Sequence, residues 1–494
     1  MQFNPNPLAN LIQGEDLMQT QLSRRTFLQL SAGTMAAVAL AACAPAGAPA
    51  PAGGGAAAPA AEKVTLNVWW FDDPINMAMI KAYSDAHPSV DVNATAIGDI
   101  VFGDQKYLTA VAGGTGPDAA AQNRHTFLQF AAKGLYKDVT PWMEKSGLKS
   151  EDFAPVQITE STWNGKVYGL PMFTDVRYLF WNTDHFAEVG LDPTKPPTTF
   201  EELAAYTDKL NVKKGDQLER YGFVPYLWGN SWMWLYGFLN KAPAISEDKR
   251  TILADDPKWE ETLAWMVDFY KKYVGDFEAT NAFSQSITST GLADPFHAGK
   301  ASMSATGDWV VGELLRIPDI KWDAAPMPVP NGGEKATWSC GFSVVMADAS
   351  KHQDEAWEFM QWSATEPGWE TKAAATLADV QAQWEREQIQ GEPQYFPQLA
   401  CYLPALNMLE EKYVSKLGDR EKRAWALGTD ALENWTHGCG TEMGVAALEY
   451  WVEMDNAARS ALALKASPAE AMATCKTKVQ EATDRAWAAI DKKA

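Results

Sequence analysis

Residues 64–70 read Val-Thr-Leu-Asn-Val-Trp-Trp, a run of β-branched and aromatic residues that predicts a strand. A helical pattern follows over residues 77–84, an alternating second strand over 91–96, and a helix over 102–112 that stops at two glycines. A strand, a helix, a strand and a helix in succession indicate an α/β fold with a parallel sheet and crossover helices.

The rest of the chain continues this pattern with longer helical segments. Helices are expected over residues 199–210, 259–273, 353–362, 443–463 and 468–490. Thr198 or Thr199 precedes the first of these, and Ser467 precedes the last, in arrangements typical of N-caps.

The composition excludes several classes of protein. The 494 residues carry 63 acidic and 42 basic side chains, a net charge of −21, which argues against a nucleic-acid partner and against adsorption to an anionic membrane through a basic patch. With 46% hydrophobic and 21% charged residues, the chain is globular, and its length permits two or three domains. Its 21 tryptophans are more than the filling of a core usually requires.

The first 42 residues predict an export signal. Arg24 and Arg25 stand before an uncharged stretch over residues 27–42, which is too short and too rich in Ala, Gly and Ser for a membrane span. The motif Ser-Arg-Arg-Thr-Phe-Leu resembles the twin-arginine signal, which exports folded cargo.

Residues 43–61 predict a lipidated tether. Leu-Ala-Ala-Cys ends at Cys43 and resembles the bacterial lipobox, in which the cysteine is acylated and becomes the new N-terminus. The alternative is a small-residue cleavage site with an incidental cysteine. Residues 44–61 contain only Ala, Pro and Gly and cannot form a core. We therefore expect a protein anchored by lipid on the extracytoplasmic face of the cell membrane.

Four further cysteines follow, at positions 340, 401, 439 and 475. Outside the cytosol an even number permits disulfides, with three possible full pairings. The sequence slightly favours Cys401–Cys439, and free thiols remain an alternative. The spacing contains no C-x-x-C, so a zinc ribbon is not expected, and we predict no metal or other cofactor.

An ordered set of short motifs carries a family resemblance. The motifs are GPD (116–118), GLYKDVT (134–140), NGKVYGLP (164–171), WNTDHF (181–186), GLD (190–192), PPTTFEE (196–202), FHAGKASM (296–303), EAWEFM (355–360) and SPAEAM (467–472). Together they resemble the extracellular solute-binding proteins, family 1, of bacterial ABC importers, a group that includes the maltose-binding proteins.

The resemblance implies a two-lobed periplasmic-binding-protein fold of type II, with a mostly parallel sheet in each lobe and a ligand cleft between the lobes. The chain would cross between lobes near residues 173–176, 339–342 and 404–408. The N-terminal lobe would hold residues 64–174 and about 340–405, and the C-terminal lobe 175–339 and about 406–494. The match is poorest over residues 378–427.

The end of the predicted first strand supplies the first candidate ligand contacts, Trp70, Asp72 and Asp73, because open parallel sheets bind ligands at their carboxyl edge. Trp69 and Trp70 cannot both face the core. The alternative is that Trp69 and Phe71 pack and Asp72 caps the next helix.

The resemblance also implies contacts after the GPD motif and at the first crossing. Asn123 and Arg124 are the candidates after the motif, with a surface ion pair as the alternative for Arg124. Asp175 matches the position of a sugar-binding acid in maltose-binding relatives. Its alternative is a pair with Arg177 that serves only the hinge.

Tryptophans and neighbouring polar residues supply the remaining candidates. Trp228, Asn230 and Trp232 lie in one aromatic stretch, although helical spacing of aromatics also suits a core. By resemblance, the further candidates are Trp309, Trp338, Gly341 and Trp451. Asp308 is a candidate as well, because it places a carboxylate where the relatives carry proline, a departure from the family pattern. Trp309 matches a sugar-stacking tryptophan, and Trp451 suits a helix core equally well.

Catalytic signatures are absent from the sequence. No two of the six histidines stand three or four residues apart, and no H-E-x-x-H, G-x-S-x-G or P-loop motif occurs. An acidic pair such as Asp72 and Asp175 would suit a glycosidase, which stays the alternative outside the class. We expect instead a monomeric, non-enzymatic receptor that captures a sugar or oligosaccharide and delivers it to the transmembrane subunits of an ABC permease. Another polar solute, such as a phosphorylated polyol, is the alternative within the class.

Overall fold

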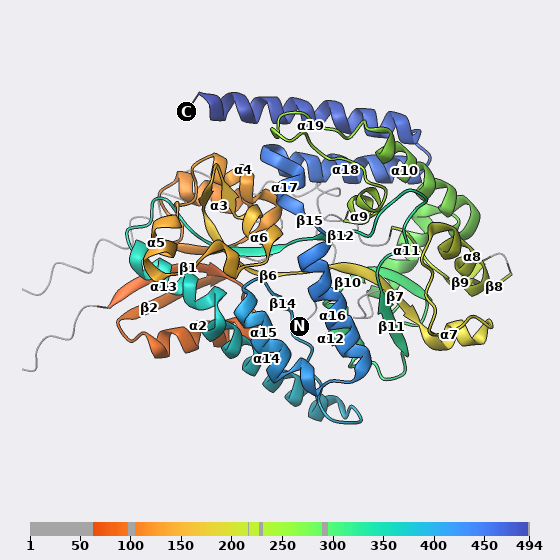
Figure 1. Ribbon diagram of the computed structural model, residues 1–494, viewed down its shortest axis with the longest axis horizontal. Helices are drawn as coiled ribbons and strands as arrows, with labels where there is room; N and C mark the ends of the chain where they lie inside the picture. The colour runs from red at the N-terminus through yellow and green to blue at the C-terminus, as the bar shows by residue number, and fades with distance from the viewer. Residues whose placement is uncertain (1–62, 97–103, 216, 227–230, 289–294, 493–494) are drawn as a thin grey trace, which may run out of the picture. The chain divides into compact units, whose positions relative to one another are not determined.

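The computed structural model describes residues 63–96, 104–215, 217–226, 231–288 and 295–492 (Figure 1). The predicted export signal, Cys43 and the tether therefore lie outside the described residues.

A mixed six-stranded sheet is built around the first predicted strand. Its order is β14-β6-β13-β3-β1-β2, with β1 (Val64–Trp70), β2 (Val90–Ala96), β3 (Ala119–Asn123), β6 (Gly169–Thr174), β13 (Gly341–Met346) and β14 (Leu399–Ala400). β1 pairs in parallel with β2 and β3, as the strand–helix succession predicts. β13 runs antiparallel to both β3 and β6, so β6 points the same way as β3.

Both faces of this sheet are covered. In β13, Val344 and Met346 belong to one hydrophobic cluster, whereas Val345 belongs to another on the opposite face. In β1, Leu66, Val68 and Trp70 are buried on one side while Trp69 points to the other. The prediction that the two tryptophans face opposite ways is confirmed.

A second sheet has the order β10-β7-β11, with β7 (Arg177–Asn182), β10 (Met303–Gly307) and β11 (Trp322–Ala325). Both β10 and β11 pair antiparallel to β7, which differs from the mostly parallel sheet expected here. Helices lie between β7 and β10 in the sequence, but the chain returns to the sheet in the opposite direction. Every residue of β7 is buried, because alternate side chains enter two different clusters.

Three short ladders complete the strands. β12 (Thr337–Ser339) pairs in parallel with β15 (Thr436–Gly438). The other two ladders are antiparallel, and they join β4 (Thr162–Trp163) to β5 (Lys166–Val167) and β8 (Val212–Lys214) to β9 (Gln217–Arg220).

Helices surround the sheets. Those up to residue 364 are α2 (Pro74–Ala86), α3 (Asp104–Ala112), α4 (Phe127–Ala132), α5 (Thr140–Ser146), α6 (Pro155–Glu160), α7 (Thr183–Glu188), α8 (Phe200–Leu210), α9 (Ser231–Leu239), α10 (Pro257–Phe269), α11 (Phe277–Thr288), α12 (Val310–Leu314) and α13 (Gln353–Ala364). Short helical turns are η2 (Arg124–Thr126), η3 (Ser150–Asp152), the π-helical η4 (Tyr270–Val274), η5 (Val414–Lys416) and η6 (Gly444–Ala446). Thr199 caps α8 by accepting from the backbone N–H of Glu202, as predicted.

The C-terminal helices are α14 (Glu366–Glu387), α15 (Leu403–Lys412), α16 (Asp419–Asn434), α17 (Cys439–Met443), α18 (Ala447–Leu462) and α19 (Pro468–Asp491). Ser467 and Glu470 form a reciprocal capping box at the start of α19, which confirms the predicted N-cap. α18 and α19 lie side by side (Figure 1) and bury apolar residues in the cluster that contains Leu179 and Trp181 of β7. α15 and α16 pack against the other face of β7, around Tyr178 and Phe180.

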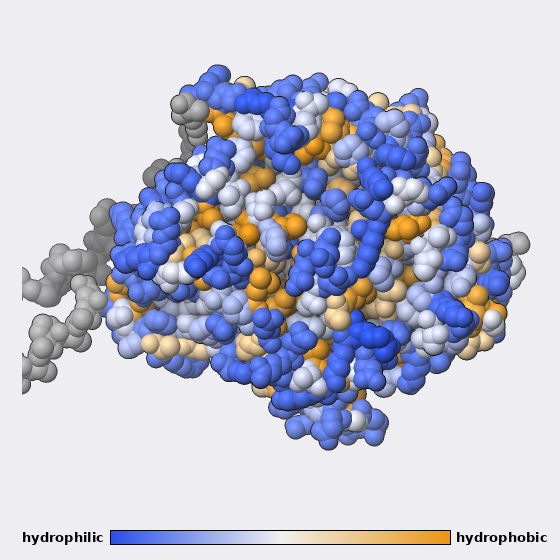
Figure 2. All heavy atoms as spheres, viewed as in Figure 1, coloured by the Kyte–Doolittle hydropathy of each residue, from blue (hydrophilic) through white to orange (hydrophobic). Residues whose placement is uncertain are grey.

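The surface is mostly polar. Figure 2 shows hydrophilic residues over most of one face, with hydrophobic residues in small patches between them. The exposed large hydrophobic residues among the described ones are Met77, Trp309, Val452 and Leu464. Single exposed apolar residues are common on protein surfaces, so the exposure of Trp309 does not by itself indicate a site. The residues around Trp309 decide whether it can contact a ligand.

Candidate functional site

The strand ends of the two sheets come together at one place. The carboxyl ends of β1, β3 and β6 lie along one edge of the first sheet, and β13 begins at the same edge because Gly341 pairs with Thr174. In the second sheet, Arg177 at the start of β7 pairs with Gly307 at the end of β10. The residues after these ends therefore face the region where the chain passes from one sheet to the other.

Three backbone segments meet there and form what we call the junction. The junction consists of residues 175–177, 308–309 and 338–340. The N–H of Asp175 donates to the carbonyl of Cys340 at 3.1 Å, and the N–H of Asp308 donates to the carbonyl of Val176 at 3.0 Å. The junction thus brings together four of the sequence-predicted contacts, two acids and two tryptophans.

Asp175 lies at the start of the junction and is 26% exposed. Its Oδ1 accepts from Nη1 of Arg177 at 2.5 Å and from the N–H of Cys340 at 3.0 Å. The pairing that the sequence left open as an alternative is therefore present. A ligand role for the rest of this carboxylate stays a prediction.

Asp308 is almost completely buried, at 3% exposure, and its Oδ1 accepts from the N–H of Val176 at 3.0 Å. Burial, with the negative charge of Asp175 as a second cause, raises the pKa of this carboxyl from 3.8 to about 7. The bond from Val176 and the charge of Arg177 oppose the shift. Asp308 is thus close to half protonated at neutral pH and can donate or accept a hydrogen bond.

Trp309 is 37% exposed and lies against the backbone of Gly307. A Cβ at position 307 would come within 1.7 Å of the indole ring, so only glycine permits this placement. The guanidinium carbon of Arg177 lies 5.5 Å from the centre of the Trp309 ring and 4.4 Å from that of Trp338. The cation holds the junction rings together and leaves Trp309 partly open to solvent.

Trp338 and Trp451 form a stacked pair, with ring centres 5.5 Å apart. Trp338 is fully buried, whereas Trp451 in α18 is partly exposed. His125 contacts both rings edge-on, at 5.5 and 4.2 Å between centres. In this conformation Trp338 belongs to the interior, and Trp451 lies at its margin.

Arg124 is fully buried and links several elements at the edge of the first sheet. Its Nε donates to Oε2 of Glu160 at 2.8 Å, and its Nη1 donates to the carbonyls of Phe173 and Phe342, each at 2.9 Å. The second oxygen of Glu160 accepts from the N–H of Gly440 at 2.7 Å. This arrangement positions strand ends, and the structure does not bring Arg124 to the surface.

Asn123 and Gly341 lie beside Arg124. Asn123 caps η2, and its Oδ1 accepts from the N–H of His125 at 2.9 Å. Gly341 has a φ of +145°, and an added Cβ would lie 2.3 Å from the carbonyl oxygen of Phe173. Both residues are buried and shape the sheet edge.

The three candidate ligand contacts at the end of β1 lie in different environments. Trp70 is buried and packs edge-on against Phe359 at 5.1 Å between ring centres. Asp73 caps α2 by accepting from the N–H groups of Ile75 and Asn76. Asp72 is exposed. The cap that the alternative assigned to Asp72 is therefore made by Asp73, and a ligand role for the exposed carboxylate of Asp72 stays a prediction.

A narrow pocket of about 10 Å³, with room for about one water molecule, lies close to this strand end, and the sequence did not predict it. Its lining includes Phe71, Phe173, Trp369 and Lys372. The ammonium of Lys372 lies 4.7 Å from the centre of the Phe173 ring and 5.1 Å from that of Trp369. Burial lowers the pKa of Lys372 to about 8, although the charge of Asp73 opposes this. The spacing of Trp369 and Lys372, three residues apart in α14, is the signal that would have placed them on one helix face.

Three predicted contacts cannot be placed. Trp228 and Asn230 lie outside the described residues, and the side chain of Trp232, at the start of α9, lies outside them as well.

A disulfide joins Cys340 to Cys439, whose Cα atoms are 5.4 Å apart. The slight preference for Cys401–Cys439 is therefore wrong. Cys401 is buried after β14, where its N–H donates to the carbonyl of Met172, and Cys475 is buried in α19; both are free thiols. The disulfide connects the junction to the first residue of α17 across 99 residues of sequence.

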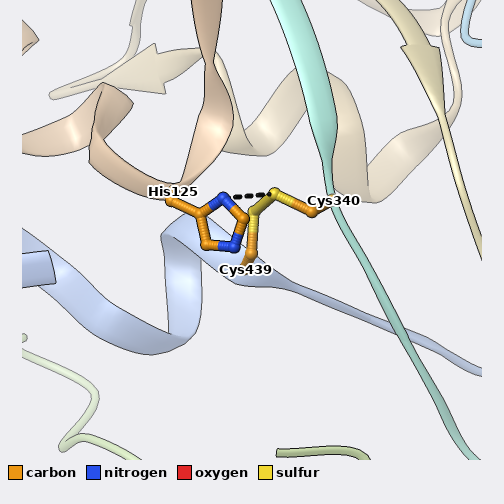
Figure 3. A group of neighbouring side chains, drawn as sticks. All are labelled: His125, Cys340 and Cys439. Carbon is orange, nitrogen blue, oxygen red and sulfur yellow. Dashed lines mark hydrogen bonds between the residues drawn. A yellow bond between two sulfur atoms is a disulfide. The ribbon is translucent and has the colours of Figure 1, made fainter. Parts of the chain in front are cut away.

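His125 lies directly beside this disulfide (Figure 3). Its Nδ1 is 2.9 Å from the sulfur of Cys340. Burial and the positive charges of Arg177 and Arg124 hold the pKa of His125 well below its ordinary value, so the ring is neutral at physiological pH.

Comparison with known proteins assigns the family. The family model for bacterial extracellular solute-binding proteins matches residues 71–368. A binding protein of Brucella abortus is 25% identical over 296 residues, covering 57% of this chain and 66% of that protein. The lactose-binding protein of Rhizobium radiobacter is 23% identical over 318 residues, covering 60% of this chain and 69% of that protein. The chain thus spans slightly less than two thirds of the first of these relatives.

Solved structures show the same fold. The ABC substrate-binding protein Lmo0181 from Listeria monocytogenes, in complex with cycloalternan, superposes with a TM-score of 0.67 at 18% identity, covering 85% of this chain and 99% of that one. The expected two-lobed type II fold is confirmed.

Family membership implies an extracytoplasmic location. Among the described residues, no helix has both the length and the apolar character that a membrane span requires. The family and the similar structures are binding proteins rather than enzymes. Since the family model covers more than half of the sequence, this chain belongs to the bacterial extracellular solute-binding proteins.

Proposed function

We propose that this protein is the substrate-binding receptor of an ABC importer, that it captures a sugar or oligosaccharide between its lobes, and that it delivers this solute to a membrane permease without breaking any bond. We further propose that Cys43 carries the lipid anchor, after export by a twin-arginine signal. The receptor would act as a monomer without a cofactor.

The observation that carries the proposal is the exposed face of Trp309 beside Arg177 and Asp175 at the junction. A sugar presents C–H groups that pack on a flat aromatic ring, and hydroxyls that hydrogen-bond to carboxylates and guanidinium groups. A stacked aromatic ring contributes about 0.5–1.5 kcal/mol beyond burial of its area. A hydrogen bond to a charged group contributes about 1.5–3 kcal/mol. The position of Trp309 is fixed by Gly307, so little entropy is lost on stacking.

The pocket at the end of β1 offers a second set of contacts in the first lobe. Phe71, Phe173 and Trp369 supply rings, and Lys372 supplies a cation. A ligand that reached from this pocket to Trp309 would contact both lobes, and contacts made only in the closed form drive closure.

A thermal-shift screen of the full chain tests the proposal, because a ligand that binds the native state raises the melting temperature. The panel contains mono-, di- and oligosaccharides and a polyol phosphate. We expect a sugar to give the largest rise in melting temperature. At a ligand concentration a hundredfold above Kd, binding stabilises the native state by about 2.7 kcal/mol. A shift with the polyol phosphate alone would favour the phosphorylated-polyol alternative, and no shift with any sugar would contradict the sugar assignment.

Variants then localise the site. Trp309→Ala should weaken the binding of the identified sugar about tenfold or more, by loss of stacking. Trp142→Ala is the matched control, since Trp142 lies in α5 and donates to Asp354 away from the junction. Incubation with labelled oligosaccharide should release no product, and turnover would instead support a glycosidase.

A further inference from the structure

The disulfide has an unusual neighbour. Cys340, the residue between β12 and β13, and Cys439 at the start of α17 are both buried, and the imidazole of His125 lies against their sulfurs. Figure 3 shows the ring beside the disulfide with Nδ1 toward Cys340. The ligand atoms of the three residues all lie within 4.8 Å of one another. Among the described residues, these three form the group of histidine, cysteine or acidic side chains whose ligand atoms lie close enough together to hold one metal ion.

We propose that His125, Cys340 and Cys439 form a site for a tetrahedral divalent cation of the zinc type, which is open when the two thiols are reduced and closed when they form the disulfide. Two thiolates and one imidazole are the ligand types that Zn²⁺ prefers, with Zn–S near 2.3 Å and Zn–N near 2.0 Å. Such distances place tetrahedral ligand atoms about 3.8 Å apart. Reduction frees the two sulfurs, and rotation of the side chains can then bring them to this separation from Cα atoms that lie 5.4 Å apart.

Two further features complete the site. Oδ1 of Asn123 lies within hydrogen-bonding distance of Nδ1 of His125 and 3.5 Å from the sulfur of Cys340, so it orients the ring and leaves Nε2 as the nitrogen that can bind the ion. Nε2 of His125 is buried without a hydrogen-bond partner among the described residues. Buried polar atoms without partners are uncommon, and an ion can complete them.

Charge and packing also suit the ion. A divalent cation with two thiolates and a neutral imidazole is neutral overall, so its burial carries no large charge penalty. The nearby guanidinium groups of Arg124 and Arg177 already have carboxylate partners in Glu160 and Asp175. The rings of Trp338 and Trp451 hold the imidazole in place, as outer residues do at metal sites.

The chemistry balances with a dithiol such as dithiothreitol as the reductant. The dithiol gives two electrons and two protons to the protein disulfide and itself becomes a disulfide. Binding of the cation then releases the two thiol protons to solvent. Reoxidation by a disulfide oxidant expels the cation and restores the cross-link. If the chain is exported as proposed, it is made in a reducing cytosol and used in an oxidising compartment, so both states are accessible to it.

The test uses the full chain with Co²⁺ as a spectroscopic probe. The protein is reduced anaerobically, desalted and titrated with Co²⁺, and thiols are counted in denaturant before and after reduction. We expect two additional thiols, one bound Co²⁺ per chain with the thiolate charge-transfer and intense d–d bands of tetrahedral coordination, and displacement of Co²⁺ by Zn²⁺. The oxidised chain should show none of these bands.

Variants separate a metal site from a purely structural disulfide. Cys439→Ser and His125→Gln should lose the tetrahedral bands, and Cys401→Ser, which removes a buried free thiol, should keep them. Circular dichroism establishes that each variant is folded. The proposal is overturned if the reduced chain gains two thiols but binds no Co²⁺, if the bands survive in both site variants, or if the disulfide of the folded chain cannot be reduced.

Discussion

The buried carboxyl of Asp308 should make the stability of the folded chain depend on pH. Asp308 accepts a hydrogen bond from the N–H of Val176 and lies near the charge of Asp175, and its pKa is raised to about 7 in the folded chain. In the unfolded chain the same carboxyl has its ordinary pKa of 3.8. Between these two values the native state holds a proton that the unfolded state has lost, so stability must fall as pH rises.

The size of the effect follows from linkage. The cost of ionising Asp308 in the folded state begins near pH 4, grows through pH 7 and is constant above it. In the pH range where only the folded state holds the proton, the free energy of unfolding falls by about 1.4 kcal/mol for each pH unit. Between pH 5 and pH 8, the free energy of unfolding should therefore fall by about 3 kcal/mol through this one group. Asp308→Asn removes the titration but keeps an oxygen that can accept from Val176.

Urea unfolding of the full chain, followed by tryptophan fluorescence at pH 5, 6, 7 and 8, measures the effect. The wild type should lose stability relative to Asp308→Asn across this range, and Asp308→Asn should be the more stable protein at pH 8. Asp91→Asn, which removes an exposed carboxylate in β2, controls for the loss of one charge. Equal pH slopes for wild type and Asp308→Asn would refute the reasoning.

Three further substitutions test how the site is held. Glu160→Gln leaves the buried Arg124 without its carboxylate partner and should lower the free energy of unfolding, measured in urea, by about 3–5 kcal/mol. Adding Arg124→Met to the same chain should restore part of this loss. Full stability of Glu160→Gln alone would contradict the importance of the buried pair. Gly307→Ala should displace the Trp309 ring and weaken sugar binding as Trp309→Ala does. The melting temperature of the free protein should change less than for a core variant. An unchanged affinity for the sugar by calorimetry would count against the placement of Trp309 in the site. Gly341→Ala should destabilise the chain by several kcal/mol, on the order of a severe core substitution, because its φ and the close carbonyl of the neighbouring strand leave no room for a methyl group, and a near-native melting temperature would disprove this.

Local features of the fold could be predicted from the sequence because their causes are local. Alternation along β1 placed Trp69 and Trp70 on opposite faces, and the residues before α8 and α19 marked both N-caps. Which of the two tryptophans faces the core depends on α13, whose Phe359 packs against Trp70. That contact joins residues far apart in sequence, and no local pattern contains it.

The same distinction explains the outcome at the candidate site. Asp175 and Trp309 were singled out by resemblance, and Asp308 as a carboxylate where the relatives carry proline; the junction brings the three together. Arg124 carries the residue type of a ligand contact, but its partner Glu160 lies 36 residues away and was not foreseen. The disulfide pairing depends on the meeting of β12 with β15, which is decided by tertiary packing rather than by spacing.

A disulfide and several hydrogen bonds tie the junction together. Cys340 bonds through its backbone to Asp175 and through its sulfur to Cys439, and Asp308 bonds to Val176. If the lobes move relative to one another, these bonds favour rotation about the junction over separation of its segments. Trp309, which follows Asp308 directly, would then stay close to the axis of rotation, whereas Lys372 belongs to α14, which lies outside the junction. If a sugar binds as proposed, stacking on Trp309 can form in the open state, and contacts near Lys372 decide closure. Trp309→Ala would then lower the affinity for every bound sugar, while Lys372→Ala would lower it most for those long enough to reach the pocket.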